Sequence, residues 1–101
     1  MKDEFDDYIY ELENVKDISN LKDLKDEDYI AFQELTKKTE TLLGLTDRDL
    51  ARMFTISIPS ATRWKQGVSA PHPLMMKHVY KRYKEKAIEL KIKKGEEHEP
   101  E

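Results

Sequence analysis

Residues that end and begin helices crowd the middle of this 101-residue chain. Glycine readily adopts the left-handed conformation that ends a helix, so Gly44 and Gly67 each predict a helix end. Thr46 and Ser57 are good N-cap residues, and the acidic residue three positions after Thr46 completes a capping box. Pro59 falls in the first turn after Ser57, where a missing N–H costs nothing. The chain has only 3 Gly and 4 Pro in all, so such breaks are rare elsewhere.

The predicted layout in this region is two short helices joined by a tight turn. The first runs from Asp47 to Phe54, residues 55–57 make the turn, and the second reaches about Gln66. A loop with two prolines follows, and the second of them opens a long helix that ends near Lys94. Two short helices with a three-residue turn are the layout of a helix-turn-helix, in which the second helix enters the DNA major groove.

Helical periodicity continues on both sides of this pair. Residues 1–16 carry apolar side chains at i, i+3, i+4 and i+7, which predicts an amphipathic helix with acidic residues at its start. These apolar side chains are Phe5, Tyr8, Ile9 and Leu12. Residues 17–25 are interpreted as a loop or a short helical turn. A helix over residues 28–43 places four side chains on one side, namely Phe32, Leu35, Thr39 and Leu42.

The fold class that follows is all-α: a small helical bundle containing a helix-turn-helix, with an acidic N-terminal helix and a long C-terminal helix. No strand pattern, internal repeat or heptad run occurs. We expect an acidic N-terminal helical segment at 1–27, a helix-turn-helix domain with its long helix at 28–94, and a disordered acidic tail at 95–101.

Charge is distributed unevenly along the chain, although the net value is only −3. Residues 1–30 carry 11 acidic and 4 basic side chains, a balance of −7. Residues 47–94 carry 12 basic and 4 acidic ones, a balance of +8, and the last seven residues add −4. A basic block between acidic ends is typical of a polyanion-binding core, and a solvated helical surface of mixed charge is the alternative.

Several other functional classes lack support in the sequence. With no Cys, a disulfide framework and thiolate metal sites are excluded, and no apolar run approaches the roughly 18 residues of a membrane span. The acidic start is unlike a signal peptide, so we expect a cytoplasmic protein that does not bind membranes. His72, His78 and His98 show no zinc spacing, and Asp3, Asp6, Asp7 and Glu11 are interpreted as exposed acids. We expect no cofactor, no metal and no enzymatic activity.

Typed positions at fixed spacing carry a resemblance to a known family. They are Leu50-Ala51, Ile56-Ser57, Arg63-Trp64-Lys65-Gln66-Gly67 and Pro71. Together they resemble the helix-turn-helix of Cro and phage repressors, the XRE family, over about residues 46–71. The resemblance implies double-stranded DNA binding and regulation of transcription in a bacterial or phage setting.

The chain departs from that pattern at four places. Thr55 replaces the usual turn glycine, so we expect a β-branched residue at positive φ. Ala61 replaces a larger Ile or Val. Asp47 replaces Gln, and its charge would repel a nearby phosphate. One long helix after Pro71 replaces two short ones.

The expected roles divide into three sets. The motif core consists of Leu50, Ala51, Phe54, Ile56, Ala61 and Trp64. Base readout from the exposed face of the second helix falls to Ile58, Pro59, Thr62 and Arg63, with Arg63 suited to guanine acceptors. Contacts to the DNA backbone are expected from Ser57, Ser60, Lys65, Gln66, Arg48, Arg52 and Lys77.

The long helix has an apolar side that is either core or partner surface, made of Met75, Met76, Val79, Tyr80, Tyr83, Ala87 and Leu90. Ile88 and Ile92 are expected to meet the N-terminal helix or a second copy, and a homodimer is one possible assembly. The acidic residues 1–30 have three interpretations: they complete the core, bind a protein partner, or cover the basic face. The leading hypothesis is a sequence-specific DNA-binding regulator. The alternative is a protein-interaction module, as in an antitoxin, with the helix-turn-helix as scaffold.

Overall fold

The computed structural model describes residues 4–15 and 25–97, and this part of the chain is built from helices without strands. The predicted all-α class is therefore confirmed. The helices are α1 (Glu4–Glu13), α2 (Asp26–Leu43), α3 (Asp47–Phe54), α4 (Ile58–Gln66) and α5 (Pro73–Glu97). None of them is both long enough and apolar enough to cross a membrane within the residues described.

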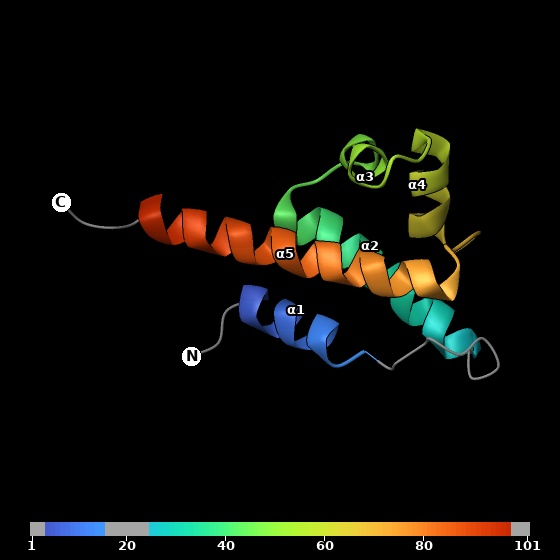
Figure 1. Ribbon diagram of the computed structural model, residues 1–101, viewed down its shortest axis with the longest axis horizontal. Coiled ribbons are helices and arrows are strands. Elements are labelled where there is room, and N and C mark those ends of the chain that lie inside the picture. Colours follow the sequence, from blue (N-terminus) through green and yellow to red (C-terminus); the bar gives the residue numbers. More distant parts are fainter. Residues whose placement is uncertain (1–3, 16–24, 98–101) are drawn as a thin grey trace.

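The long helix α5 is the axis on which the other helices are arranged (Figure 1). The α1 helix lies along one side of α5, while α3 and α4 lie on the opposite side, with α4 standing steeply against the direction of α5. The α2 helix packs against α1, α4 and α5, and α3 packs against α4. The acidic N-terminal helix and the helix-turn-helix are thus held on different sides of one bundle.

Aromatic rings form the centre of the core where α2, α3, α4 and α5 meet. Phe32 contacts Trp64 edge to face with ring centroids 5.5 Å apart, and Tyr80 at 5.7 Å. Phe54 lies 5.8 Å from both Trp64 and Tyr83. Such pairs stabilise a core beyond the burial of their area, by about 1 kcal/mol each. One continuous aromatic cluster therefore fixes α4 against the rest of the bundle.

The α1 helix is docked by burial and by ion pairs. Phe5, Tyr8 and Leu12 are buried, and the Tyr8 hydroxyl is hydrogen-bonded to the Thr39 hydroxyl of α2. Thr39 donates its own proton to the Leu35 carbonyl, so Tyr8 is the donor in this pair. Burial raises the pKa of Tyr8 above its ordinary value, which keeps the phenol protonated.

The pairing between α1 and α5 is antiparallel. Asp6 pairs with Lys91, and Glu13, seven residues further along α1, pairs with Lys84, seven residues back along α5. A spacing of seven residues returns to the same side of both helices, so one seam carries both pairs. The α1 helix thus completes the core with its apolar side, while Asp6 and Glu13 lie against lysines of the basic block on α5.

Some helix boundaries and faces differ from the sequence-based expectations. The α2 helix begins two residues earlier than expected, at Asp26, because the Lys25 N–H is capped by Asp28 at 2.8 Å. The α5 helix continues through Gly95 to Glu97, beyond the predicted end at Lys94. On α2, Leu43 is buried together with Thr36, whereas Leu42 is only partly buried, so the buried face is rotated slightly from the predicted one.

The apolar side of α5 is core along most of its length. Five of its predicted members are buried, namely Met76, Val79, Tyr80, Tyr83 and Ala87, and Met75 and Leu90 are partly buried. Ile88 and Ile92 are 39% and 58% exposed, so α1 does not bury them. The predictions for Asp3, for the loop over residues 17–24, for His98 and for the tail over residues 98–101 lie outside the described residues.

Candidate nucleic-acid interface

The local signals that predict α3 and α4 act as expected. The Thr46 hydroxyl accepts from the Asp49 N–H at 3.2 Å, and the Asp49 carboxylate accepts from the Thr46 N–H at 2.8 Å, which completes the capping box. These bonds lower the pKa of Asp49. Gly44 and Gly67 are left-handed, with φ of 66° and 77°. The two short helices are thus ended and started by their own residues.

The turn between α3 and α4 contains the expected exception. Thr55 has φ of 54°, the one non-glycine residue at positive φ in the part of the chain that the structure describes. Its N–H and that of Ile56 both bond to the Ala51 carbonyl, the latter at 3.0 Å. A β-branched residue in the left-handed region is strained by roughly 1–2 kcal/mol. The turn geometry required by the two helices overrides this local preference.

One side of α4 is packed and the other is presented. Leu50, Ala51, Phe54, Ala61 and Trp64 are buried and Ile56 is partly buried, so all six expected members of the motif core lie between the helices. The opposite side of α4 carries Ile58, Pro59, Thr62, Arg63 and Gln66, spaced so that they share one face. Four of these are exposed and Thr62 is half-buried. The face predicted for base readout is therefore accessible.

The N-terminal end of α4 is capped within the chain. The Ser57 hydroxyl accepts from the Ser60 N–H at 3.2 Å and lies 2.8 Å from the Ser60 hydroxyl. Pro59 has no N–H to offer. The expected phosphate site at this helix end therefore has fewer available donors than a helix start usually has.

Below the presented face, four side chains from three helices form a polar cluster that we term the junction cluster: Glu40, Asp47, Thr62 and Lys65. Thr62 donates to Asp47 Oδ2 at 2.6 Å, and Lys65 Nζ lies 3.0 Å from Asp47 Oδ1 and 3.3 Å from Glu40 Oε1. The Glu40 side chain is only 11% exposed. This cluster ties the end of α2 and the start of α3 to α4.

The carboxyl groups of the cluster titrate far from their ordinary values. Burial raises the pKa of Glu40 to about 7, and hydrogen bonding and the negative charge of Asp47 act in the same direction. Hydrogen bonds from Glu40 and Thr62 lower the pKa of Asp47 to about 2. Hydrogen bonding to Asp47 raises the pKa of Lys65. Asp47 is thus ionised near neutral pH, where Glu40 changes between its acid and carboxylate forms.

The junction cluster changes the expected contact set at two positions. Lys65 is held between Glu40 and Asp47 and its side chain is 36% exposed, so it serves the helix junction before any phosphate. Thr62 shares its single proton between Asp47 and the Ile58 carbonyl at 3.1 Å, which leaves only its oxygen for a base. Asp47, expected to repel phosphate, instead forms these internal contacts.

Basic side chains are spread over two surfaces. Arg48, Arg52 and Arg63 are exposed on α3 and α4, and Lys77 is exposed near the start of α5. Most of the positive block lies on α5, where Lys84 and Lys91 face carboxylates of α1. The exposed positive charge of the surface that contains α3 and α4 therefore comes from a few arginines and not from most of the basic block.

Glu40 and Gln33 make contacts with α4 that the sequence analysis does not predict. Glu40 lies four residues after the buried Thr36 on the same face of α2, but Thr36 is not among the predicted buried residues, so the sequence carries no signal for Glu40. Gln33 Nε2 donates to the Lys65 carbonyl at 3.2 Å. Gln33 Oε1 lies only 2.6 Å from the position that a Cβ on residue 67 would occupy. The left-handed φ of Gly67 is what favours glycine here, since the end of the flexible Gln33 side chain could shift to make room for a Cβ.

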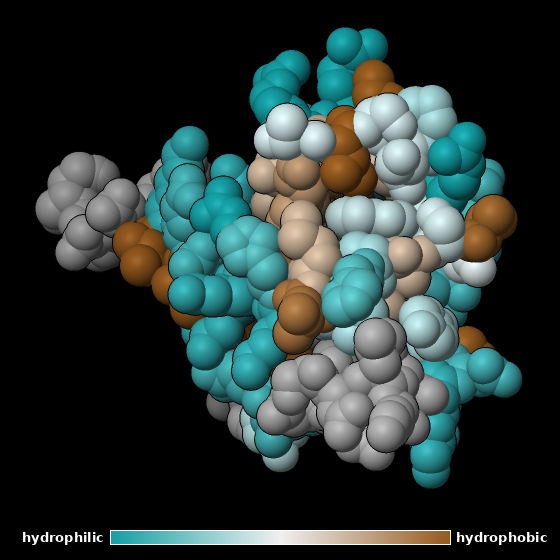
Figure 2. Space-filling model, turned by 45° about the vertical axis from the view of Figure 1, so that its right-hand side comes forward, coloured by the Kyte–Doolittle hydropathy of each residue, from teal (hydrophilic) through white to brown (hydrophobic). Residues whose placement is uncertain are grey.

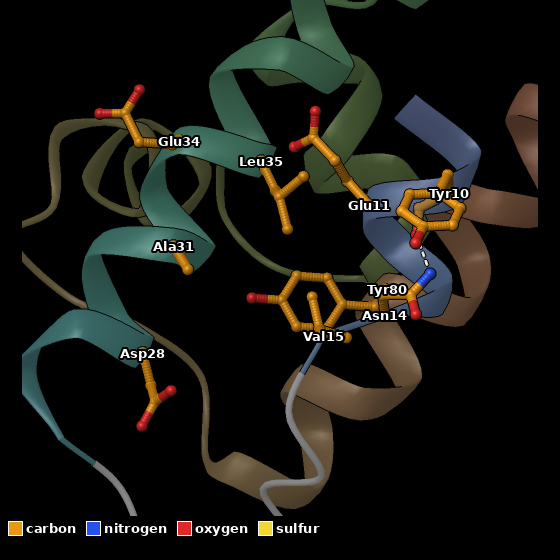
Figure 3. Close-up of a pocket in the computed structure, with 9 residues that line it drawn as sticks. All are labelled: Tyr10, Glu11, Asn14, Val15, Asp28, Ala31, Glu34, Leu35 and Tyr80. Carbon is orange, nitrogen blue, oxygen red and sulfur yellow. Dashed lines mark hydrogen bonds between the residues drawn. The ribbon is translucent and has the colours of Figure 1, made fainter. Parts of the chain in front are cut away.

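A groove of about 420 Å³ between α1, α2 and α5 offers no catalytic arrangement (Figure 3). The carboxyl groups of Glu11, Asp28 and Glu34 on its rim point in different directions, and Asn14 bonds to the Tyr10 carbonyl at 2.8 Å. Among the residues described, no three His, Cys, Asp or Glu side chains gather as metal ligands. This groove lies beside α1, away from α3 and α4.

Comparison of the chain with protein-family models, with curated proteins and with solved structures finds no match.

Proposed function

We propose that this protein binds double-stranded DNA in a sequence-specific way and regulates transcription, with α4 in the major groove. The observation that carries the proposal is the position of α4. Its buried side is locked to the bundle by Ala61 and Trp64, while Ile58, Pro59 and Arg63 project from its other side. A short, rigidly held helix with one presented face is what groove reading requires.

The proposed readout depends mainly on Arg63, whose guanidinium can donate to both major-groove acceptors of a guanine. Ile58 and Pro59 would contact thymine methyl groups, and Arg48 and Arg52 on α3 would hold phosphates. The positions that resemble the XRE-type motif, over about residues 46–71, place these side chains at the points where that motif meets DNA. The α1 helix would not contact the DNA in this arrangement, because it lies on the other side of α5 from α3 and α4 (Figure 1).

The test is selection of binding sites from a randomised duplex pool, followed by fluorescence anisotropy on the enriched site at about 0.05 M and about 0.2 M salt. We expect wild type to enrich one motif and Arg63→Ala to lose about tenfold in affinity, since one bidentate base contact is worth about 1–3 kcal/mol. Lys37→Ala is the matched control. It also removes an exposed positive charge, but from the groove between α1 and α2.

The outcomes separate three cases. Loss with Arg63→Ala and not with Lys37→Ala supports base readout by α4. Equal, unselective binding by all three proteins, falling steeply with salt, means attraction to the DNA backbone only. Absence of binding at the lower salt concentration contradicts the proposal.

A protein-interaction module is the second candidate, favoured by exposed apolar side chains near α4. Ile58, Val68 and Leu74 are 40%, 70% and 60% exposed. Figure 2 shows hydrophobic side chains reaching the surface at several places among hydrophilic ones on this side of the molecule. In this alternative, as in an antitoxin, the helix-turn-helix is a scaffold and the acidic N-terminal segment or α5 contacts the partner. Wild type that binds no DNA but copurifies in a defined complex would favour it.

A further inference from the structure

The junction cluster contains two buried carboxyl groups and only one ammonium group. Glu40 Oε2 and Asp47 Oδ1 are both buried, and Glu40 Oε2 has no hydrogen-bond partner among the described residues. Lys65 Nζ lies near Asp47 Oδ1 at 3.0 Å and is shared with Glu40 Oε1 at 3.3 Å. Two carboxylates with one cation leave an uncompensated buried charge, which is costly.

A single proton resolves this arrangement. The Lys65 ammonium brings the two carboxyl groups together, because its Nζ lies 3.0 Å from Asp47 Oδ1 and 3.3 Å from Glu40 Oε1, and hydrogen bonding between the carboxyl groups helps to raise the pKa of Glu40. A proton on Glu40 Oε2 can be donated to the Asp47 carboxylate, which gives the unpaired Glu40 oxygen a partner. The cluster then carries one negative and one positive charge and is neutral overall.

We propose that Glu40 and Asp47 share one proton, and that its release loosens the junction of α2, α3 and α4 and so makes the presentation of α4 depend on pH. With the proton in place, Glu40 at the end of α2 is bonded to Asp47 at the start of α3, and Asp47 holds Thr62 of α4 at 2.6 Å. Without it, the two carboxylates repel each other across this joint. Asp47 and Thr62 move together because of their hydrogen bond, so the disturbance reaches α4.

The groups that face Glu40 come from each neighbouring helix of the junction. Asp47 of α3 is the like charge, Lys65 of α4 is the opposite charge, and Tyr83 of α5 faces the carboxyl group from the core. Tyr83 stays neutral, since burial raises the pKa of its phenol above the ordinary value. The balance within the cluster is therefore decided by Glu40, the member that titrates near neutral pH.

The effect on folding stability has a defined sign. Because the folded-state pKa of Glu40 is raised to about 7 from 4.5, the folded protein binds more protons than the unfolded chain between these values. Stability therefore falls as pH rises from 4.5 to about 7 and is flat above. Asp47 acts oppositely: its lowered pKa stabilises the fold above 3.8, and this contribution is lost as pH falls towards about 2. The combined contribution of these two groups to stability is therefore largest near pH 4.

The first experiment follows the side-chain carboxyl carbons and backbone amides of the full chain by NMR through a pH titration. We expect Glu40 to titrate near neutral pH and the amides of α3 and α4 to shift with the same midpoint. Glu40→Gln, which keeps a donor for Asp47 and an acceptor for Lys65, removes these amide shifts. Glu34→Gln is the matched control on α2, because the Glu34 side chain is 65% exposed. Both variants retain the chain's three histidines, so a difference between the variants does not come from them.

The second experiment measures DNA affinity at about pH 6 and about pH 8.5 at constant ionic strength, and this readout rests on the proposed function. Between pH 8.5 and pH 6, the DNA affinity of wild type and of Glu34→Gln should rise about fivefold more than the affinity of Glu40→Gln does. A change of this size is typical of weak coupling between sites. In Glu40→Gln the part of the pH dependence due to the junction cluster is absent. Asp47→Asn, a second variant, should move the Glu40 titration towards its ordinary range.

The results distinguish this inference from the proposed function. If Glu40 titrates below about pH 5, the shared proton is disproved, whatever the DNA data show. If Glu40 titrates near neutral pH and the α3 and α4 amides do not respond, the coupling is disproved. If the NMR expectations hold and no variant binds DNA, the proton-dependent junction stands and the DNA-binding proposal fails.

Discussion

Carboxylates and ammonium groups meet in two regions of this molecule with opposite consequences. Along the seam between α1 and α5, Lys84 pairs with Glu13, and the two side chains are 37% and 48% exposed. In the junction cluster, Lys65 pairs with Asp47 and Glu40, whose side chains are 21% and 11% exposed. The chemistry of the groups is the same and the two lysines are about equally exposed, at 36% and 37%, but the carboxylates differ in their access to water.

Water access decides what each set of charges does. Exposed pairs are screened and contribute about 0–1 kcal/mol, so α1 is held mainly by its buried apolar side chains. Buried charges must be balanced, since an unpaired one is strongly destabilising. The seam therefore tolerates the loss of a charge, whereas the junction cluster couples protonation to the positions of three helices.

Removal of one ammonium group from each region gives the largest expected effect. Lys65→Met keeps most of the side-chain stem but leaves Asp47 and Glu40 without their cation, and we expect a loss of about 2 kcal/mol at pH above neutral. This is below the usual cost of breaking a fully buried pair because Lys65 is 36% exposed. Lys84→Met, the matched change on the seam, should cost less than about 0.5 kcal/mol. Urea denaturation measures both.

The pH dependence of the stability losses in Lys65→Met and Lys84→Met provides a further check. Below neutral pH Glu40 is protonated, so the loss in Lys65→Met should shrink, while that in Lys84→Met should not follow this trend. Equal losses for the two variants at every pH would show that burial does not distinguish the two regions.

The elements that the sequence predicts well are those whose signals are local. Gly44, Thr46, Ser57 and Gly67 act through their own backbone conformation or through a residue three positions away, so α3 and α4 have the predicted bounds. The apolar periodicity of α1 and α5 likewise predicts which of their side chains are buried.

What the sequence does not disclose depends on contacts between distant residues. Glu40 and Lys65 are 25 positions apart, and neither shows by itself that it is buried beside the other. Asp47 is interpreted from sequence as a charge facing phosphate because its partners Thr62 and Lys65 are unknown at that stage. The end of α5 is also misjudged, since a glycine near a helix end does not always end it.

Relief of backbone strain at Thr55, in the turn between α3 and α4, should have a smaller effect on stability. It sharpens the comparison of the two regions because the seam between α1 and α5, as far as the structure describes it, has no residue strained in this way. Thr55 has φ of 54° and is exposed, so Thr55→Gly removes strain without loss of packing. We expect a gain of about 0.5–1 kcal/mol, after the greater flexibility of glycine in the unfolded chain is subtracted. Thr55→Ala keeps a Cβ at positive φ and should not give this gain. Thermal and urea unfolding of the three proteins measure the difference, and a gain with alanine as large as with glycine would contradict the explanation.

The smallest expected effect is the coupling between Glu13 and Lys84 on the seam. A double-mutant cycle with Glu13→Gln and Lys84→Met should give about 0.3–0.5 kcal/mol at low salt. At about 1 M salt, where the screening length falls to about 3 Å, this coupling should disappear. The parallel cycle with Asp47→Asn and Lys65→Met should retain most of its coupling, because a partly buried pair is screened much less. If salt removed both couplings equally, the junction cluster would be as open to solvent as the seam, and its charges would have no means of holding α4 in place.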